Sequence, residues 1–319
     1  MNDLRPVPAV TRAAVVAAAE RIVGLVVRTE LRETSLRGHR LWLKCESLQK
    51  GGAFKLRGAT NRLLQLSADE RASGVVAFSS GNHAQGVAIA ARRLGIAATI
   101  VMPSDAPQLK VDGTRAEGAE VIFYDRQTES REAIAADLAA KIGATVVPSF
   151  DDPAIVAGQG TVGLEILDQM DEPPTRIVIP CGGGGLAAGI ALACPDADIV
   201  IVEPEGWDDM AHSLDRGEIV SVRPDAPATL CDALQTPRVS PITLDILRRR
   251  EASAVAVGDA DVEEAIRWCW REQGLVVEAG GAAALAAVLA GKVDLVPETV
   301  IVLSGGNVDP ALHARIIAG

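Results

Sequence analysis

The chain has 319 residues, of which 48% are hydrophobic and 23% charged, and its 31 Lys and Arg against 42 Asp and Glu leave a net charge of −11. This composition excludes a disordered chain and predicts one large domain or two modest ones. No apolar run reaches the roughly 18–20 residues that a membrane span needs, and an acidic chain without a basic cluster is a poor nucleic-acid binder.

Short β-branched runs alternate along the chain with Ala- and Leu-rich amphipathic stretches, which is typical of βαβ units around a parallel sheet. The expected strands, in chain order, are Gly74–Phe78, Ala97–Met102, Glu120–Phe123, Arg176–Pro180, Ile199–Val202 and Thr299–Leu303. The expected helices are Asn82–Leu94, Ser130–Ile142, Val162–Met170, Leu186–Leu192, Asp261–Arg271 and Ala282–Leu289. Ser67 and Glu70 have the spacing of a capping box. Because the strand runs are apolar throughout, we expect an α/β fold with helices on both faces of the sheet.

The five cysteines are scattered along the chain and lack CxxC spacing; they are Cys45, Cys181, Cys194, Cys231 and Cys269. Their pattern indicates reduced, buried thiols rather than a disulfide framework or a zinc site. The first ten residues also lack the basic and apolar segments of a signal peptide. We therefore expect a cytoplasmic protein.

Glycine-bearing polar turns follow three of the expected strands. Ser79-Ser-Gly-Asn-His83 follows the first strand, Cys181-Gly-Gly-Gly-Gly185 the fourth and Ser304-Gly-Gly-Asn307 the last. Parallel sheets bind ligands in the loops beyond the carboxyl ends of their strands. The three turns together therefore predict a ligand site.

The second of these turns contains four consecutive glycines, namely Gly182, Gly183, Gly184 and Gly185. They precede an expected helix, whose free N–H groups and positive dipole end make an anion cradle suited to a phosphate. A plain strand-to-helix turn is the alternative. Neither the Walker sequence nor GxGxxG spacing is present, which weakens nucleoside triphosphate and dinucleotide interpretations.

Lys55 is the lysine that the sequence singles out. Phe54 precedes it, and Gly51 and Gly52 allow the chain to bend just upstream. An amine needs partial desolvation to act as a nucleophile near neutral pH, and an aromatic neighbour helps to provide it. A solvated lysine at a helix start is the alternative.

Five motifs occur in the order found in fold-type-II pyridoxal-phosphate enzymes: Gly51-Gly-Ala-Phe-Lys-Leu-Arg-Gly-Ala59, Ser79-Ser-Gly-Asn-His-Ala-Gln-Gly86, Ala157-Gly-Gln-Gly160, Gly182-Gly-Gly-Gly-Leu186 and Ser304-Gly-Gly-Asn307. Over nearly its whole length the chain resembles the branch that contains serine/threonine dehydratases, serine racemases and 3-hydroxyaspartate dehydratases. It departs from the family pattern with Gly-Ala before Phe54 and with Glu278-Ala-Gly-Gly in place of Glu-Pro-Ser-Gly. Both departures could tune the fit of the substrate.

The resemblance implies a two-domain α/β fold like that of the tryptophan synthase β chain, with parallel sheets covered by helices. Residues 1–72 and 153–319 would form the large cofactor-binding domain, and residues 73–152 a small mobile domain. The cofactor, pyridoxal 5′-phosphate, would lie in the cleft between them. Relatives suggest a homodimer.

The resemblance also implies residue roles toward this cofactor. Lys55 would hold it as a Schiff base and, once displaced, remove the Cα proton of the substrate. Gly182–Gly185 would bind the 5′-phosphate and Asn82 the 3′-oxygen. Ser304 would face the pyridine nitrogen, and Phe54 would pack near the ring.

Substrate contacts are implied by the same resemblance. Ser79, Asn82 and His83 would bind the substrate carboxylate. Ser80 corresponds to the serine that delivers a proton from the opposite face in racemases. Arg131 aligns with an arginine that reaches a second carboxylate in serine racemase, although an ordinary surface arginine is the alternative.

An acidic turn, Val202-Glu-Pro-Glu-Gly-Trp-Asp-Asp209, resembles the cation site of serine racemase and hydroxyaspartate dehydratase. Its ligands would be Glu203, the Trp207 carbonyl and Asp209, with waters completing an oxygen shell. Such a shell suits Mg²⁺, Mn²⁺ or Ca²⁺. A solvated acidic turn is the alternative.

These features predict an ammonia-lyase (dehydratase) that removes water from a small-molecule amino acid of the serine, threonine or 3-hydroxyaspartate type and yields a 2-oxo acid and ammonia. The main alternative is a serine or aspartate-type racemase that uses Lys55 and Ser80 as its two bases. A β-replacement synthase and a catalytically silent binding protein are further alternatives. Because no residues follow Gly319, we do not expect the regulatory domain of biosynthetic threonine dehydratases or feedback by isoleucine.

Overall fold

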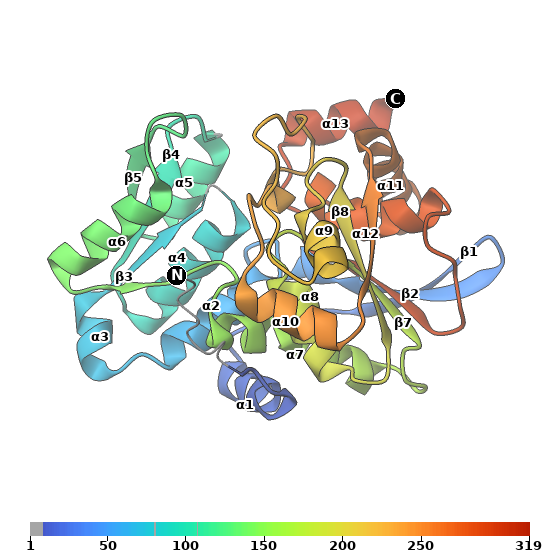
Figure 1. Ribbon diagram of the computed structural model, residues 1–319, viewed down its shortest axis with the longest axis horizontal. Coiled ribbons are helices and arrows are strands. Elements are labelled where there is room, and N and C mark those ends of the chain that lie inside the picture. The colour runs from blue at the N-terminus through green and yellow to red at the C-terminus, as the bar shows by residue number, and fades with distance from the viewer. Residues whose placement is uncertain (1–8, 80, 107) are drawn as a thin grey trace.

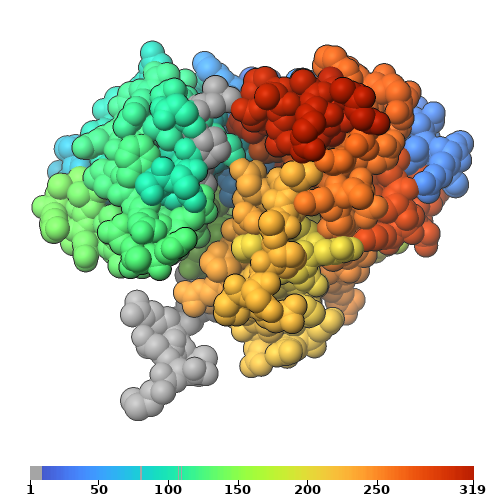
Figure 2. All heavy atoms as spheres, turned by 90° about the horizontal axis from the view of Figure 1, so that it is seen from above, coloured from blue at the N-terminus to red at the C-terminus, as the bar shows by residue number. Residues whose placement is uncertain are grey.

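The computed structural model describes residues 9–79, 81–106 and 108–319. Its strands form two sheets, one of six strands and one of four, which lie in two lobes side by side (Figure 1). Seen from above, the teal and green smaller lobe meets the orange and red larger lobe along a seam (Figure 2). The predicted α/β fold is therefore confirmed.

The six-stranded sheet has the order β1-β2-β10-β7-β8-β9. Its strands are β1 (Leu31–Leu36), β2 (His39–Cys45), β7 (Arg176–Pro180), β8 (Asp198–Pro204), β9 (Ser253–Val257) and β10 (Thr299–Leu303). All neighbours are parallel except β1, which forms an antiparallel hairpin with β2 at the edge. The central strands β10, β7 and β8 carry mostly Ile and Val because both of their faces are covered.

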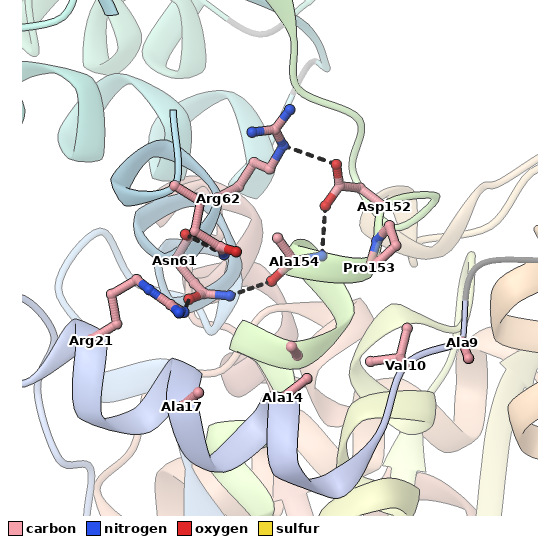
Figure 3. A pocket seen from close by; sticks show the side chains of 12 residues that line it. Ala9, Val10, Ala14, Ala17, Arg21, Asn61, Arg62, Asp152, Pro153 and Ala154 are labelled. Carbon is pink, nitrogen blue, oxygen red and sulfur yellow. Dashed lines mark hydrogen bonds and ion pairs between the residues drawn. The ribbon is translucent and has the colours of Figure 1, made fainter. Parts of the chain in front are cut away.

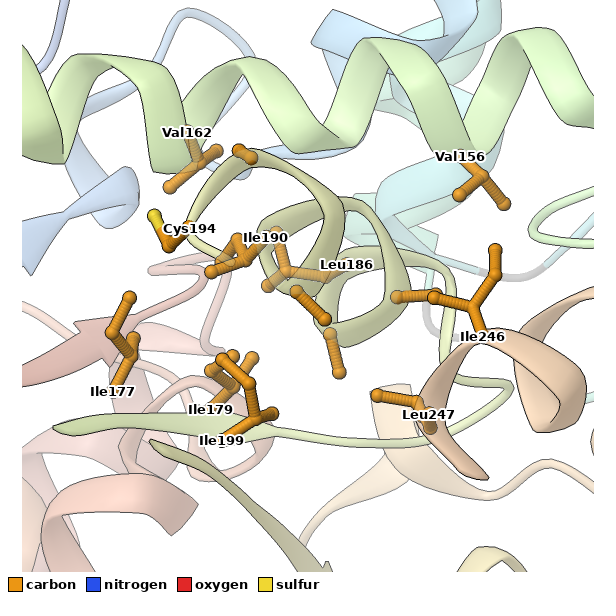
Figure 4. Close-up of a cluster of buried hydrophobic side chains, with 14 of the residues drawn as sticks. Val156, Val162, Ile177, Ile179, Leu186, Ile190, Cys194, Ile199, Ile246 and Leu247 are labelled. Carbon is orange, nitrogen blue, oxygen red and sulfur yellow. The ribbon is translucent and has the colours of Figure 1, made fainter. Parts of the chain in front are cut away.

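Helices cover this sheet on both sides. On one side lie α1 (Arg12–Ile22), α7 (Pro153–Gln169), α8 (Gly185–Ala193), α9 (Asp209–Arg216) and α10 (Pro241–Arg249); on the other lie α11 (Asp259–Gln273), α12 (Ala279–Leu289) and α13 (Pro310–Ala318). Helix α2 (Lys55–Leu64) packs between α7 and the smaller lobe. Side chains alternate along β7, so that Ile177 and Ile179 face α8 while Val178 packs in the core with α12 (Figure 4). Ile190 of α8 fills the space between α7 and the sheet.

The four-stranded sheet is parallel throughout, with the order β5-β4-β3-β6. Its elements are β3 (Val75–Phe78), β4 (Ala98–Pro103), β5 (Glu120–Tyr124) and β6 (Thr145–Val146), with α3 (Ala68–Ser73), α4 (Asn82–Leu94), α5 (Gln108–Ala116) and α6 (Arg131–Ile142). The apolar side of α4 packs against α2 and one face of the sheet, and α6 covers the other face. All four strands fall within the segment 73–152 that we predict to be a separate domain.

The helices α2, α7 and α8 cross closely at positions that are occupied by glycine. A Cβ atom on Gly158 of α7 would lie 2.6 Å from the Cα of Gly58 in α2, and a Cβ on Gly189 of α8 would lie 2.5 Å from the main-chain nitrogen of Gly160. The Gln159 side chain accepts a hydrogen bond from the Gly58 N–H at 3.1 Å. The Ala157-Gly-Gln-Gly160 motif thus seats α2 on α7, and the first residue of α2 is Lys55.

Eleven of the twelve strands and helices predicted from the sequence have both ends within three residues of the observed ones; α1, β1, β2, α2, β9, α9, α10 and α13 are among the elements that were not predicted. The capping box is confirmed, since the Ser67 hydroxyl accepts from the Glu70 N–H at 3.2 Å and the Glu70 carboxylate accepts from the Ser67 N–H at 2.7 Å. The expected helix Val162–Met170 is only the second half of α7. All five cysteines are buried and unpaired, as predicted. Among the described residues, no helix is long and apolar enough to cross a membrane.

Candidate active site

Lys55 lies at the start of α2, directly after a turn in which Gly51 and Gly52 have positive φ angles of 79° and 72°. Such angles favour glycine, and the turn carries the chain from β2 into the helix. The Lys55 Nζ donates to the carbonyl oxygen of Ser149 at 3.2 Å and lies 5.1 Å from the centroid of the Phe54 ring. Burial lowers the pKa of this amine from 10.5 to about 8. The predicted partly desolvated amine is thus present.

The end of β10 lies against the Lys55 segment. Ala53 and Gly305 form an antiparallel bridge, and the Phe54 N–H donates to the carbonyl oxygen of Ser304 at 3.2 Å. Ser304 is 5% exposed, and its hydroxyl makes no hydrogen bond to the part of the chain that the structure describes. The structure therefore places Ser304 next to the segment that carries Lys55, although the two residues are far apart in the sequence.

The glycine turn after β7 leads into α8. Gly184 is the N-cap residue, with a φ angle of 83°, and a Cβ atom there would lie 2.6 Å from the Met210 Cε. A Cβ atom on Gly183 would collide with the ring of Phe150, which follows the Ser149 that accepts from Lys55. Side chains would therefore displace the turn from this position. The first N–H groups of α8 have no helical partner and give this end of the helix its affinity for anions.

Asn82 begins α4, and its side-chain amide is held from both ends. The amide oxygen accepts from the Asn307 Nδ2 at 2.7 Å, and the amide nitrogen donates to the Glu278 Oε1 at 2.5 Å. Asn307 also donates to the carbonyl oxygen of Gly51 at 2.8 Å. These bonds connect the start of α4 to the Lys55 turn and to the end of β10.

The His83 ring donates from Nε2 to the carbonyl oxygen of Val147 at 2.9 Å. Burial and the nearby charge of Lys55 lower the pKa of the imidazole to about 3, so that the ring is neutral. Its Nδ1 is then an acceptor and has no described partner. The ring is unsuited to hold a carboxylate, which leaves the main-chain N–H of His83 for the predicted role.

The structure describes two of the three remaining residues that are predicted to contact the substrate. The Ser79 hydroxyl accepts from the Gly81 N–H at 3.2 Å, and Ser80 lies outside the described residues. Arg131, the first residue of α6, has its guanidinium carbon 5.6 Å from the centroid of the Phe78 ring, and its Nε donates to Glu132 at 2.9 Å. Because Phe78 ends the strand that leads into the Ser79 turn, Arg131 lies at the side of the predicted substrate loop.

A pair of buried carboxylates lies behind the glycine turn. Both oxygens of Glu203 accept main-chain N–H groups at the start of α9, from Met210 at 3.0 Å and from Ala211 at 2.9 Å. Asp209 is 2% exposed, and neither of its carboxylate oxygens has a described hydrogen-bond partner. Burial raises the pKa of Glu203 to about 8 and that of Asp209 to about 7. Met210 links this pair to Gly184 of the turn.

Comparison with known proteins matches residues 24–305 to the family described as pyridoxal-phosphate dependent enzyme. The chain belongs to this family. An L-threo-3-hydroxyaspartate ammonia-lyase of Pseudomonas sp is 42% identical over 96% of this chain and 98% of its own. An L-threonine ammonia-lyase of Thermotoga maritima is 39% identical over 94% of this chain and 76% of its own. The structure of maize serine racemase superposes on this chain with a TM-score of 0.91 and 34% sequence identity, and the match covers 98% of each chain.

The site of this pyridoxal-phosphate-dependent enzyme fits its cofactor. Lys55 has no ion-pair partner in the described parts of the chain, so that its amine is available for an aldehyde. The glycine turn at the start of α8 offers main-chain donors for a phosphate, while the Ser304 hydroxyl and the second N–H of the Asn82 amide remain available for a ring. The surroundings of these residues are therefore compatible with the roles that we predict for them in cofactor binding.

Two polar residues of the site were not predicted from the sequence. In the sequence, Glu278 stands out only as part of a departure from the family pattern, and Asn307 only as the end of a motif. Neither could be placed beside Asn82 without the fold, because Glu278 lies 196 positions and Asn307 225 positions away in the sequence.

A cavity of about 380 Å³ lies apart from these residues, among α1, α2 and α7 (Figure 3). Its polar side chains pair with one another: Arg21 donates to Asn61 at 2.5 Å and Arg62 pairs with Asp152 at 2.9 Å. None of the predicted site residues lines it. The cavity therefore adds nothing to the active site.

Proposed function

We propose that the chain is an ammonia-lyase that removes water from a β-hydroxy-α-amino acid and, after a water molecule hydrolyses the resulting imine, yields a 2-oxo acid and ammonia. The observation that carries the proposal is the meeting of three segments at Lys55. The Lys55 amine donates to the Ser149 carbonyl, the next residue, Phe150, packs on the glycine turn, and the Ser304 carbonyl accepts from the Phe54 N–H. The similarity to ammonia-lyases over nearly the full chain supports elimination over the racemase alternative.

Pyridoxal phosphate, when bound, supplies an aldehyde for amines and a ring that draws electrons from the substrate Cα. Gly182–Gly185 would hold its phosphate, and Asn82 and Ser304 would hold the ring. The Lys55 amine would bind the aldehyde and serve as the base for the Cα proton, because its lowered pKa leaves a sizeable neutral fraction near pH 7. Ser304 would offer the ring a neutral hydroxyl rather than a carboxylate.

The segment 73–152 is proposed to close over the bound substrate. Lys110 of α5 pairs with Asp232, and this ion pair joins the smaller lobe to the larger. The Lys110 Nζ also lies 3.9 Å from the position of a Cβ on Gly81, within the predicted substrate loop. Closure of this segment would exclude water during elimination.

We expect the wild-type enzyme to release ammonia from a β-hydroxy amino acid, with L-threo-3-hydroxyaspartate as the preferred member of a panel that includes serine and threonine. If Arg131 binds the second carboxylate, Arg131→Ala should raise the KM for hydroxyaspartate about 10- to 100-fold, which is the loss of affinity expected when one charge-assisted hydrogen bond is removed. The KM for serine should not change. Steady-state ammonia release measures both effects.

Arg126→Ala is the matched control, since Arg126 is an exposed arginine of the same lobe that pairs with Asp105 at 2.7 Å. Equal losses on serine and hydroxyaspartate in Arg131→Ala would remove Arg131 from the substrate site. Formation of D-serine from L-serine faster than ammonia release would favour the racemase alternative.

We further propose that Glu203 and Asp209, with the Trp207 carbonyl and waters, hold a divalent cation such as Mg²⁺, Mn²⁺ or Ca²⁺. The unpartnered oxygens of the buried Asp209 support this proposal, because a buried carboxylate without a partner is costly. No cluster of three or more His, Cys, Asp or Glu side chains occurs among the described residues, so main-chain and water oxygens must complete the shell.

Chelation with EDTA is expected to lower the melting temperature and the ammonia-lyase rate, and added Mg²⁺ to restore both. Asp209→Asn should make both quantities insensitive to chelation, whereas Asp208→Asn, a change at the neighbouring residue, should leave the response intact. Calorimetry and ammonia release provide the two measurements. Indifference of the wild-type enzyme to EDTA would reject the cation.

A further inference from the structure

Glu278 is a buried carboxylate to which the proposed function gives no role. It precedes α12 and is 3% exposed, its N–H donates to the carbonyl oxygen of Gly305 at 3.0 Å, and its carbonyl oxygen accepts from the Ala282 N–H at 2.9 Å. Within the described residues, the hydrogen-bond donor to its side chain is the Asn82 amide. The described residues provide no cation in contact with this carboxylate, and a buried carboxylate without an ion-pair partner is costly. A structural role would explain its presence.

The surrounding backbone is shaped around this carboxylate. A Cβ atom on Gly305 would collide with the Glu278 Oε1 and would lie 3.2 Å from the Asn82 Nδ2. A Cβ on Gly281 would in turn collide with the carbonyl oxygen of Gly305. Glycines at these two positions therefore allow the carboxylate to lie between the Ser304 turn and Asn82.

The two ends of the Asn82 amide have the same shape but opposite hydrogen-bonding character. Asn307 donates to the amide oxygen at 2.7 Å, and Glu278 accepts from the amide nitrogen at 2.5 Å. If the amide turned over, donor would face donor and acceptor would face acceptor. The two partners thus select one orientation, which leaves the second amide N–H free.

We propose that Glu278 is a positioning residue for the cofactor, because it turns the nitrogen of the Asn82 amide, rather than its oxygen, toward the ring 3′-oxygen of pyridoxal phosphate. This inference rests on the role proposed for Asn82. An amide oxygen at that position would repel the 3′-oxygen, whereas the N–H donates to it.

The charge state of Glu278 does not alter this role. The pKa of the carboxyl is raised to about 7, chiefly by burial and also by the charge of Asp232, while the Asn82 hydrogen bond and the charge of Lys110 oppose the change. A carboxylate oxygen and the carbonyl oxygen of a protonated carboxyl both accept from an N–H. Glutamine has such an oxygen too, so Glu278→Gln should preserve the function that Glu278→Ala removes.

The test is a double-mutant cycle on the dissociation constant of pyridoxal phosphate, measured by titrating the apoprotein and following the visible absorbance. Glu278→Ala and Asn82→Ala are each expected to weaken binding about tenfold, and the double variant also about tenfold, because both residues act through one contact. Glu278→Gln should stay within about threefold of the wild type.

Glu298→Gln is the matched control, because Glu298 precedes the other end of β10 and pairs with Arg40 and the Trp42 indole. Independent losses that multiply to about 100-fold would overturn the proposal, as would an equal loss in Glu278→Gln. If Glu278→Ala does not fold, Asn307→Ala gives the same cycle with Asn82→Ala. A wild-type protein without a visible band would instead reject the proposed function itself.

Discussion

Replacement of Lys55 by alanine is expected to abolish covalent attachment of pyridoxal phosphate and to lower ammonia release at least about 10³-fold. The same amine is proposed to hold the cofactor and to move the Cα proton, so no neighbouring group can replace it. Borohydride reduction of the holoprotein followed by peptide mapping locates the modified lysine, and ammonia release gives the rate.

The surroundings of Lys55 explain why this lysine should react. A pKa of about 8 in place of 10.5 raises the neutral fraction at pH 7 from about 0.03% to about 10%. The neutral amine is the nucleophile, so the rate of cofactor attachment to the apoprotein should rise with pH and level off above about pH 8.

Lys50→Ala provides the matched control, because Lys50 is an exposed lysine only five positions upstream. It should keep the visible absorbance, the borohydride label and the rate of the wild type. A label recovered on any lysine other than Lys55 would contradict the proposed site.

Replacement of Arg57 by methionine is expected to lower the free energy of unfolding by about 3–5 kcal/mol, the usual cost of removing one partner from a buried ion pair. Arg57 is fully buried and lies two residues after Lys55. Its guanidinium donates to Glu46 at 2.8 Å and to Glu165 at 2.6 Å, and Lys44 also donates to Glu165 at 2.6 Å.

The size of the effect follows from what remains after the substitution. Burial alone would raise the pKa of Glu46, but Arg57 holds it below its usual range. Without the guanidinium, Glu46 and Glu165 face each other with Lys44 as their one remaining cation among the described residues. One of the carboxylates must then take up a proton or remain uncompensated, and both outcomes are costly.

Chemical denaturation followed by circular dichroism measures this loss. Arg92→Met is the control, because Arg92 is an exposed arginine of α4 that pairs with Glu117 at 3.3 Å, and its loss should cost less than about 1 kcal/mol. Equal denaturation midpoints for the two variants would show that the buried network does not stabilise the protein.

Elements with a strong local pattern were predicted well from the sequence. The strands β7 and β10 have the predicted ends, because each is an apolar run buried on both faces. The hairpin of β1 and β2 was not predicted, since β1 lies at an edge and reads LRETSL, with polar side chains on its exposed positions. The first half of α7 was also missed, because its two glycines resemble a loop and become helical through close packing on α2 and α8.

The same distinction holds for the active site. Motifs of neighbouring residues identified Lys55, the glycine turn and Ser304, because the chemistry of each can be recognised within a few positions. The neutral state of the His83 ring could not be predicted, since it follows from burial and from the Val147 carbonyl, 64 positions away. The contacts of Arg131 with Phe78 and Glu132 depend likewise on how α6 packs on the smaller sheet.

The α/β class, the family and the residues with reactive groups can be predicted from composition, periodicity and short motifs. The burial of charged groups beside one another and the orientation of the Asn82 amide cannot be predicted in this way. Burial and hydrogen-bond direction arise from contacts between distant segments, such as Glu278 with Asn82 and Arg57 with Glu165. Local patterns have no information about such contacts until the sheets and helices have brought the segments together.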